Sequence, residues 1–122
     1  MSSQSDGVVR TQILAASSSW DGVVLPNYPQ GVPRVTILRI TIAPHAKLAM
    51  HRHLMINAGM VLAGELTVVA KSGITAQFKS GEGVIELVDT WHYGENRGDT
   101  PVELVMFYAG TTTDESLSEL DL

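Results

Sequence analysis

The sequence predicts an all-β fold, and three observations support that class. Val, Ile and Thr account for 30 of the 122 residues, and their branched side chains fit pleated strands better than helices. Eleven glycines and five prolines interrupt the chain at short intervals. Between them lie apolar runs of four to nine residues that recur about every ten residues, a pattern typical of a sandwich or a barrel.

The N-terminal and C-terminal segments differ in composition from the rest of the chain. We expect three segments: a flexible N-terminal tail at 1–7, a barrel domain at 8–110 and an acidic C-terminal tail at 111–122. Residues 8–14 (VVRTQIL) predict a first strand. Thr112 and Glu115 have the spacing of a capping box, which predicts a short C-terminal helical turn. A disordered acidic end is the alternative.

The segment 15–34 is expected to be a loop. It holds three prolines and two glycines, too many for a regular strand or helix. A loop of about twenty residues in a small domain is usually a lid or another functional element. Trp20 and Tyr28 lie in it. Two interpretations are open: these aromatic residues pin the loop to the barrel wall, or they line the mouth of a pocket.

From residue 35 onward, short strands follow one another. Residues 35–43 (VTILRITIA) are apolar at nearly every position, which predicts a strand covered on both faces, and Pro44 ends it. The other predicted strands are 48–54, 60–63, 66–71, 75–79, 84–87, 91–96 and 102–109. Turns rich in Gly, Ser, Asn and Asp separate them.

Composition excludes several classes of function. A chain of 122 residues has room for one hydrophobic core and one domain. The net charge is −5 and the basic residues form no run, so we expect no nucleic-acid partner. Without cysteine there is no disulfide and no thiolate metal site. No signal-peptide pattern and no apolar run near ~20 residues is present, so we expect a cytoplasmic protein with no membrane partner.

Three histidines carry the most informative chemistry. Residues i and i+2 of a strand share a face, so His51 and His53 point one way. His92 lies on a later strand, and the three imidazoles converge if the two strands face each other across a barrel interior. Such His pairs are common on exposed strands, but the apolar neighbours predict an interior location. Imidazoles buried there without a ligand would be costly, and a neutral imidazole is the commonest metal ligand.

Two carboxylates lie near these histidines in the sequence. Strand alternation pairs Glu86 with Val84 against the apolar Ile85 and Leu87, and the apolar pair is expected to face inward. Glu65 lies in a turn and is expected to be solvated. The sequence therefore shows no general base beyond a metal-bound water.

The first histidine pair stands in a motif that resembles one of the cupins, a family of small β-barrels. The first cupin motif runs Gly, five residues, His-x-His, three residues, Glu, six residues, Gly. This chain matches it at His51, His53 and Gly64. It departs from it at His45, which stands in place of the first Gly and is expected to be an exposed turn residue. It also departs at Asn57, which stands in place of the Glu.

The second cupin motif runs Gly, five residues, Pro-x-Gly-x-x-His, three residues, Asn. This chain matches it at Gly81, His92 and Asn96. Leu87 and Asp89 replace the Pro and the Gly, which is expected to alter a turn and not a ligand. The resemblance covers about residues 35–110, and two motifs in register are much more specific than either alone.

The resemblance implies a single-domain cupin β-barrel of the double-stranded β-helix, or jelly-roll, type. It implies one divalent transition metal ion (Fe, Mn, Ni, Zn or Cu) held by His51, His53 and His92. Asn57 would be a weak fourth ligand or a hydrogen-bond donor to a bound molecule. Cupins of this size are usually dimers, often formed by exchange of N-terminal strands, which would be residues 8–14 here.

The resemblance leaves the reaction open, because cupins include oxygenases, isomerases, decarboxylases, lyases and plain binding domains. We expect a metal-dependent enzyme that acts on a small organic molecule inside the barrel. Its chemistry would be dioxygenase-like, which is slightly favoured, or that of a Lewis-acid isomerase or lyase. The alternative is a non-enzymatic, metal-dependent module that binds or senses a small molecule.

Overall fold

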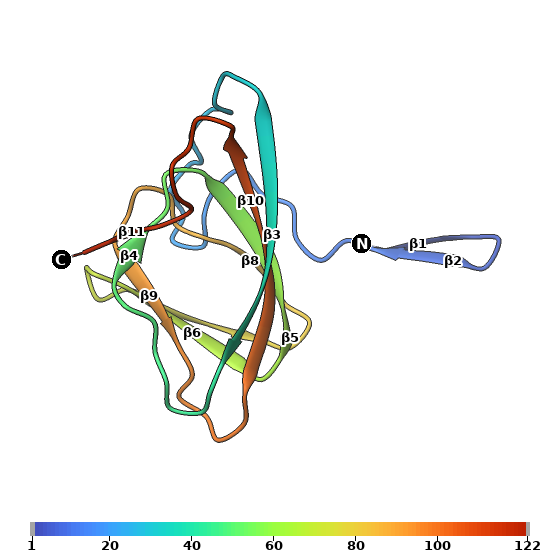
Figure 1. Cartoon of the computed structure of the whole chain (residues 1–122). Coiled ribbons are helices and arrows are strands. Elements are labelled where there is room, and N and C mark those ends of the chain that lie inside the picture. Colours follow the sequence, from blue (N-terminus) through green and yellow to red (C-terminus); the bar gives the residue numbers. More distant parts are fainter. Residues whose placement is uncertain (1, 122) are drawn as a thin grey trace.

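Two antiparallel sheets face each other and enclose the interior of a barrel (Figure 1). The computed structural model describes residues 2–121. The first sheet has the strand order β3-β10-β5-β8 and the second β11-β4-β9-β6-β7. Their bounds are β3 (Pro33–Ile42), β4 (His51–Arg52), β5 (Ile56–Ala63), β6 (Glu65–Ala70), β7 (Thr75–Lys79), β8 (Gly83–Ile85), β9 (His92–Glu95), β10 (Val102–Thr111) and β11 (Glu119–Leu120). The all-β prediction is confirmed.

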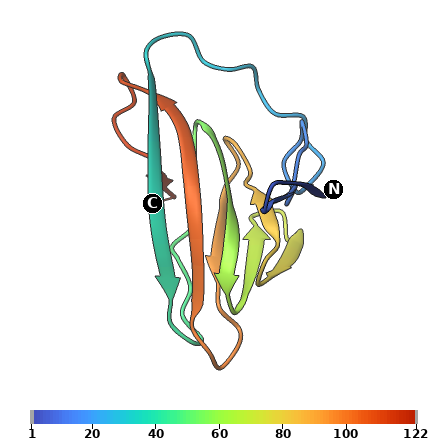
Figure 2. The ribbon, with the colours of Figure 1, turned by 90° about the vertical axis from the view of Figure 1, so that its right-hand side faces the viewer.

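Side-chain alternation along β10 builds much of the barrel core. Val102, Leu104, Met106 and Tyr108 are buried, whereas the residues between them are more exposed. This alternation follows from the two-residue period of a strand. β10 pairs along its whole length with β3 and along most of it with β5, as Figure 2 shows from the side. The inward row of β10 therefore lines the barrel from one end to the other.

The outer face of β3 differs from the sequence prediction. Residues 35–43 are apolar enough for a strand covered on both faces, but Val35 and Ile37 are exposed. β3 is an edge strand, bonded only to β10. Most of its outer surface is uncovered, and the inward residues Leu38, Ile40 and Ile42 line the interior. The apolar outer residues are left facing solvent.

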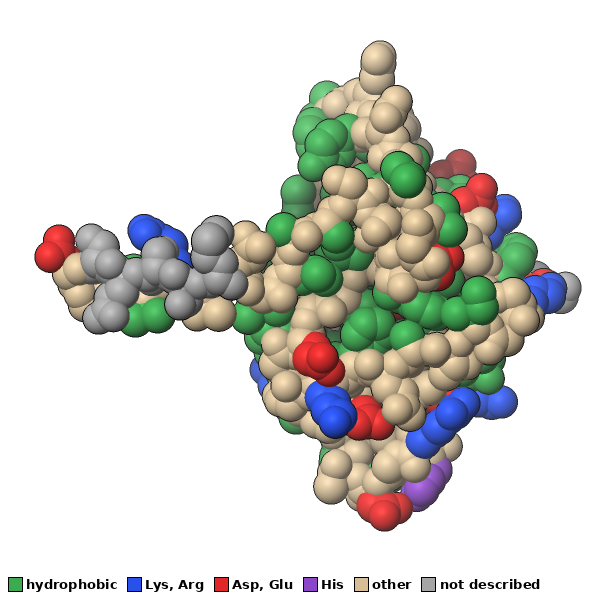
Figure 3. Space-filling model, turned by 180° about the vertical axis from the view of Figure 1, so that it is seen from behind, with side chains coloured by type: hydrophobic (Ala, Val, Ile, Leu, Met, Phe, Trp, Pro, Cys, Tyr) green, Lys and Arg blue, Asp and Glu red, His purple; other side chains and the backbone are tan. Residues whose placement is uncertain are grey.

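The N-terminal segment is more ordered than the sequence predicts. Where a loose tail is expected over 1–7, the structure has a hairpin of β1 (Ser2–Ser5) and β2 (Val8–Thr11). The hairpin stands away from the barrel as an arm (Figures 1 and 3). The predicted first strand over 8–14 ends at Thr11, and Met1 lies outside the described residues.

The C-terminal segment forms neither the helical turn nor the disordered end that the sequence suggests. Residues 2–121 contain no helix at all, so none that could span a bilayer. The tail crosses the barrel wall, and β11 pairs with β4. Arg52 holds it there through Glu119 at 2.8 Å, and Lys71 holds Asp121 at 2.8 Å. Leu122 lies outside the described residues.

Candidate metal centre

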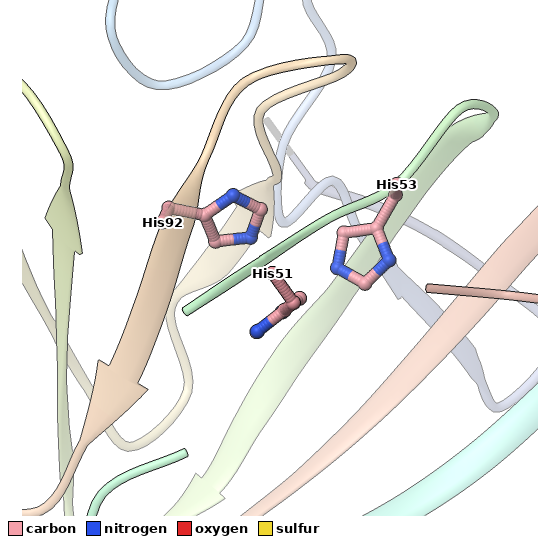
Figure 4. Close-up of side chains that lie close together, drawn as sticks. All are labelled: His51, His53 and His92. Carbon is pink, nitrogen blue, oxygen red and sulfur yellow. The ribbon is translucent and has the colours of Figure 1, made fainter. Parts of the chain in front are cut away.

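The three histidines come from two neighbouring strands of one sheet. His51 on β4 lies directly opposite His92 on β9, and His53 follows just after β4 ends. The condition named for their convergence, two strands that face each other across the barrel interior, is not met, because β4 and β9 are hydrogen-bonded neighbours. The convergence itself is confirmed: the ring centroids lie 4.6–5.2 Å apart and the rings point toward one another (Figure 4).

Hydrogen bonds determine which ring nitrogen each histidine presents. Each Nδ1 lies 2.7–2.9 Å from a backbone carbonyl: His51 on Ala49, His53 on Leu117 and His92 on Thr90. Because a carbonyl oxygen only accepts, each Nδ1 must donate a proton. The lone pair of each neutral ring is then on Nε2. This is the arrangement that orients imidazoles toward a metal ion in known sites.

The spacing of these ring nitrogens suits one ion. One ligand nitrogen from each of the three histidines lies within 4.8 Å of the others. An ion held at about 2.1 Å by all three nitrogens would need them closer together than 4.8 Å, so the rings would have to shift toward it. The Nε2 atom of His92 is buried and has no hydrogen-bond partner in the described structure. The cluster could therefore bind a metal ion.

Burial also keeps two of the rings neutral. Loss of hydration lowers the pKa of His53 and of His92 from 6.5 to about 4 in the metal-free protein, against the raising effect of the carbonyl on each Nδ1. Only 4% of His53 and 1% of His92 is exposed. Both rings are thus uncharged near pH 7, which is the form that binds metals.

Asn57 presents an acceptor to the cavity. Its Nδ2 donates to the Met55 carbonyl at 3.1 Å, while its buried Oδ1 has no hydrogen-bond partner among the described residues. The sequence predicts that Asn57 is either a weak fourth metal ligand or a hydrogen-bond donor to a bound molecule. Because Nδ2 donates to Met55, the amide offers the cavity an oxygen that can accept a hydrogen bond or contact a cation. An unpaired buried oxygen is costly and points to a bound group.

Glu86 faces the cavity, contrary to the sequence prediction. Its Oε2 lies 3.8 Å from Nε2 of His92, and the side chain is 11% exposed. Alternation placed Glu86 with Val84 correctly, but Val84 is the inward residue and belongs to the core. Ile85 and Leu87 face the other way and are buried too, with Ala15 and Ala16 of the 15–34 loop beside Ile85, so both faces of this segment are buried. The apolar character of Ile85 and Leu87 therefore did not show which face of the strand points into the barrel.

Trp20 holds Glu86 in place. Its indole Nε1 donates to Oε1 of Glu86 at 2.8 Å, and its backbone N donates to the Ile85 carbonyl. The ring packs edge-on against Phe78. The interpretation that Trp20 pins the loop to the barrel is confirmed, although Trp20 does not itself line the histidine cavity. Burial raises the pKa of Glu86, and the hydrogen bond from Trp20 opposes that rise.

Tyr28 does not lie at the mouth of the histidine cavity. It is 83% exposed and borders a separate surface depression formed with Pro29 and Gly110.

Tyr108 points into the cavity, although no motif in the sequence marked it, and its ring lies 5.5 Å from that of His53. Burial and the charge of Glu86 raise the pKa of Tyr108. The alternation of β10 was the only feature of the sequence that could have predicted its inward position.

Two non-glycine residues occupy motif positions that favour glycine. His45 has φ 63° and Asp89 has φ 52°, both in the left-handed region that glycine enters without steric cost. Both turns therefore hold a non-glycine residue in a conformation that favours glycine. His45 is exposed and bonds Asp99 at 3.0 Å, as its prediction as a turn residue requires. Asn96 stabilises the next turn, donating to the Ile42 and Thr100 carbonyls and accepting from the Gly98 backbone.

The histidines open onto a cavity of about 360 Å³ inside the barrel. Its polar lining consists of the three histidines, Asn57, Glu86, Tyr108 and Ser118. The rest is mainly aliphatic: Leu38, Ile40, Ile42, Leu48, Ala49, Leu66, Val68, Leu104, Met106 and Leu120, with Gly94. The volume is in the range of small-molecule sites. Ser118 and Leu120 belong to the C-terminal tail, whose contribution sequence reasoning missed.

The fold and the site together define a small β-barrel protein with an inward histidine cluster that could bind a metal ion. Residues 38–108 match the family model described as the cupin domain, and the chain belongs to the cupin family. The search of curated proteins yields no match.

Solved structures with the same barrel include enzymes. The chain is similar to an oxalate oxidase in complex with the substrate analogue glycolate (TM-score 0.56, 24% identity, 62% of this chain and 42% of that chain). It is similar to a DMSP lyase from Ruegeria pomeroyi (0.60, 16%, 70% and 42%). It is also similar to the Bacillus subtilis oxalate decarboxylase, which has Mn(II) centres (0.57, 21%, 70% and 23%). The chain spans less than half the length of each of these proteins.

Proposed function

We propose that this protein is a metal-dependent enzyme that transfers protons on a small organic molecule inside the barrel, as a Lewis-acid isomerase or lyase does. His51, His53 and His92 would hold one divalent transition metal ion. The observation that carries the proposal is the buried carboxylate of Glu86, 3.8 Å from His92 and inside the same cavity. A metal site alone is equally suited to binding, whereas a carboxylate beside it supplies an acid–base group.

The metal-site part of the proposal is supported by the donor set. Three neutral imidazoles suit Fe, Mn, Ni, Zn or Cu and leave open positions around the ion. The similar oxalate decarboxylase has Mn(II) centres, which makes manganese the first ion to test. When bound, the ion would polarise a carbonyl or carboxylate oxygen of the ligand.

The residues of this chain would divide the remaining work. Glu86 would take a proton from the ligand carbon next to the polarised carbonyl and return it at the same or a neighbouring atom. Trp20 would hold Oε1 of Glu86 through its 2.8 Å hydrogen bond, leaving Oε2 toward the cavity. The unpartnered Oδ1 of Asn57 would accept a hydrogen bond from the ligand. The apolar walls would exclude bulk water.

Proton exchange tests this function without knowledge of the natural substrate. Protein loaded with manganese or zinc is incubated in D₂O with 2-oxohexanoate, and deuterium entry at C3 is followed by mass spectrometry. We expect exchange that needs both metal and protein. Glu86→Gln should slow it by about 100-fold or more, the usual contribution of a positioned base.

Two controls accompany the exchange experiment. Glu65→Gln makes the same change at an exposed position outside the cavity and should leave exchange unchanged. Metal content of Glu86→Gln should equal that of the wild type, since the imidazoles are the ligands. Absence of exchange with every 2-oxo acid tried, in protein that binds metal and ligand, would instead favour the non-enzymatic binding module.

We also propose that the protein is a homodimer formed through the N-terminal arm. Val8 and Val9 are exposed on the hairpin that stands away from the barrel (Figure 3), and exposed apolar arms of this kind are suited to contact a second copy. Light scattering should give a mass near twice 13.1 kDa. Val9→Asp should shift the protein to monomers, while Val24→Asp, on the exposed 15–34 loop, should not. A wild-type monomer at high concentration would contradict the dimer.

A further inference from the structure

We infer that the cavity binds a molecule with one anionic, oxygen-bearing head and an uncharged apolar tail, and that it discriminates against phosphorylated ligands and dianions. The inference rests on the proposed metal centre, which would bind the head. It goes beyond that proposal by naming the class of ligand. The evidence for it is the strand register and the distribution of charged side chains around the cavity.

Register separates a polar from an apolar part of the cavity. Tyr108 pairs with Asn57 across β10 and β5, and His92 pairs with Ala70 across β9 and β6. These pairs place the polar side chains at one end of the long strands. The side chain of Glu86 joins them, because its backbone N donates to the Asn57 carbonyl.

The other end of the cavity is aliphatic. Leu104 lies four residues before Tyr108 on β10, about 13 Å along the strand, and pairs with Ile40 of β3. In the other sheet, Leu66 also lines the cavity and lies four residues before Ala70, the residue paired with His92. A ligand whose head reaches the histidines therefore extends its other end between aliphatic walls.

No cationic side chain is available for a second negative charge. All eight Lys and Arg residues lie within the described chain, and none of them lines the cavity. Arg39 and Arg52 are directed to carboxylates outside it, at Glu103 and Glu119 respectively. The one ionisable carboxyl inside, Glu86, lies at the histidine end and offers no positive charge to the other end of a ligand. Burying a phosphate or a second carboxylate against aliphatic walls would be costly.

Three 2-oxo acids with the same chelating head test the inference by isothermal titration calorimetry. The probes are pyruvate, 2-oxohexanoate and 2-oxohexanedioate, added to manganese-loaded protein of measured metal content. Each buried methylene should raise affinity about fourfold, so 2-oxohexanoate should bind at least tenfold more tightly than pyruvate. 2-Oxohexanedioate has the same chain length with a terminal carboxylate and should bind at least tenfold more weakly than 2-oxohexanoate.

A matched pair of variants adds a cation inside or outside the cavity. Leu38 lines the cavity and is 36% exposed, so Leu38→Lys places an ammonium group near the tail. Leu62 is 39% exposed and does not line the cavity, so Leu62→Lys makes the same change elsewhere. We expect Leu38→Lys to reduce the preference for 2-oxohexanoate over 2-oxohexanedioate at least fivefold, and Leu62→Lys to leave it unchanged.

The outcomes separate this inference from the proposed function. Metal-loaded wild-type protein that binds 2-oxohexanedioate as tightly as 2-oxohexanoate, or that binds pyruvate as tightly, would overturn the inference and leave the metal centre intact. Equal effects of Leu38→Lys and Leu62→Lys would also overturn it. Failure of the protein to bind manganese or any other ion tried, seen in the metal analysis, would overturn the proposed centre instead.

Discussion

Alanine in place of His51, His53 or His92 is expected to reduce metal content from one ion per chain to well below one. Each replacement leaves two imidazoles in a site that needs at least three strong ligands. The affinity for the metal ion should therefore fall by at least about 100-fold. Loss of a residue that only hydrogen-bonds to a ligand usually costs less. The expected result is the same for all three positions because their nitrogens share one centre. Elemental analysis and titration with manganese or zinc alone measure the change.

Two other positions make the metal experiment specific. His45→Ala removes the remaining histidine, which is exposed and bonded to Asp99, and should leave metal content unchanged. Asn57→Ala should also retain the metal, whereas Asn57→Glu should tighten binding by adding a negative charge. Loss of metal from His45→Ala together with retention in His92→Ala would contradict the assignment.

Protonation of two buried histidines should destabilise the metal-free protein between pH 6.5 and pH 4, and the raised pKa of Glu86 should offset part of that loss, because the folded protein takes up a proton there more readily than the unfolded chain. Burial lowers the pKa of His53 and His92 to about 4 in the folded state, against 6.5 in the unfolded chain. Between these values the unfolded chain binds more protons, so the free energy of unfolding falls as pH falls. The loss approaches roughly 3 kcal/mol for each ring at the lower limit. Urea unfolding of metal-free protein at pH 7 and pH 4.5 measures most of it.

A variant that lacks one of the two rings tests the origin of this pH dependence. His53→Leu should remove at least about half of the loss in stability between pH 7 and pH 4.5, because His92 is then the one remaining histidine of the pair and Glu86 still opposes its effect. Met106→Leu changes another buried cavity residue without removing a titrating group and should keep the full dependence. An unchanged pH dependence in His53→Leu would show that other groups cause the acid sensitivity.

Local patterns in the sequence determined the fold class and the histidine cluster. Strand alternation depends only on the two-residue period of an extended chain, so the sequence alone predicted that His51 and His53 share a face. The spacing of two motifs predicted that His92 joins them, and the structure confirms the convergence. The positions of most strands from residue 56 onward followed from turn residues in the same way.

Only the tertiary structure decided which faces are buried and by what. Glu86 points inward because the 15–34 loop packs against Ile85 from outside, and Trp20 of that loop donates a hydrogen bond to the carboxylate. β3 is half exposed because it lies at a sheet edge. The C-terminal tail closes the barrel because β11 pairs with β4. Contacts between segments far apart in the chain leave no trace in local periodicity. The sequence alone therefore predicted the barrel and the histidine cluster. The inward orientation of Glu86 and the shape of the cavity depend on tertiary packing.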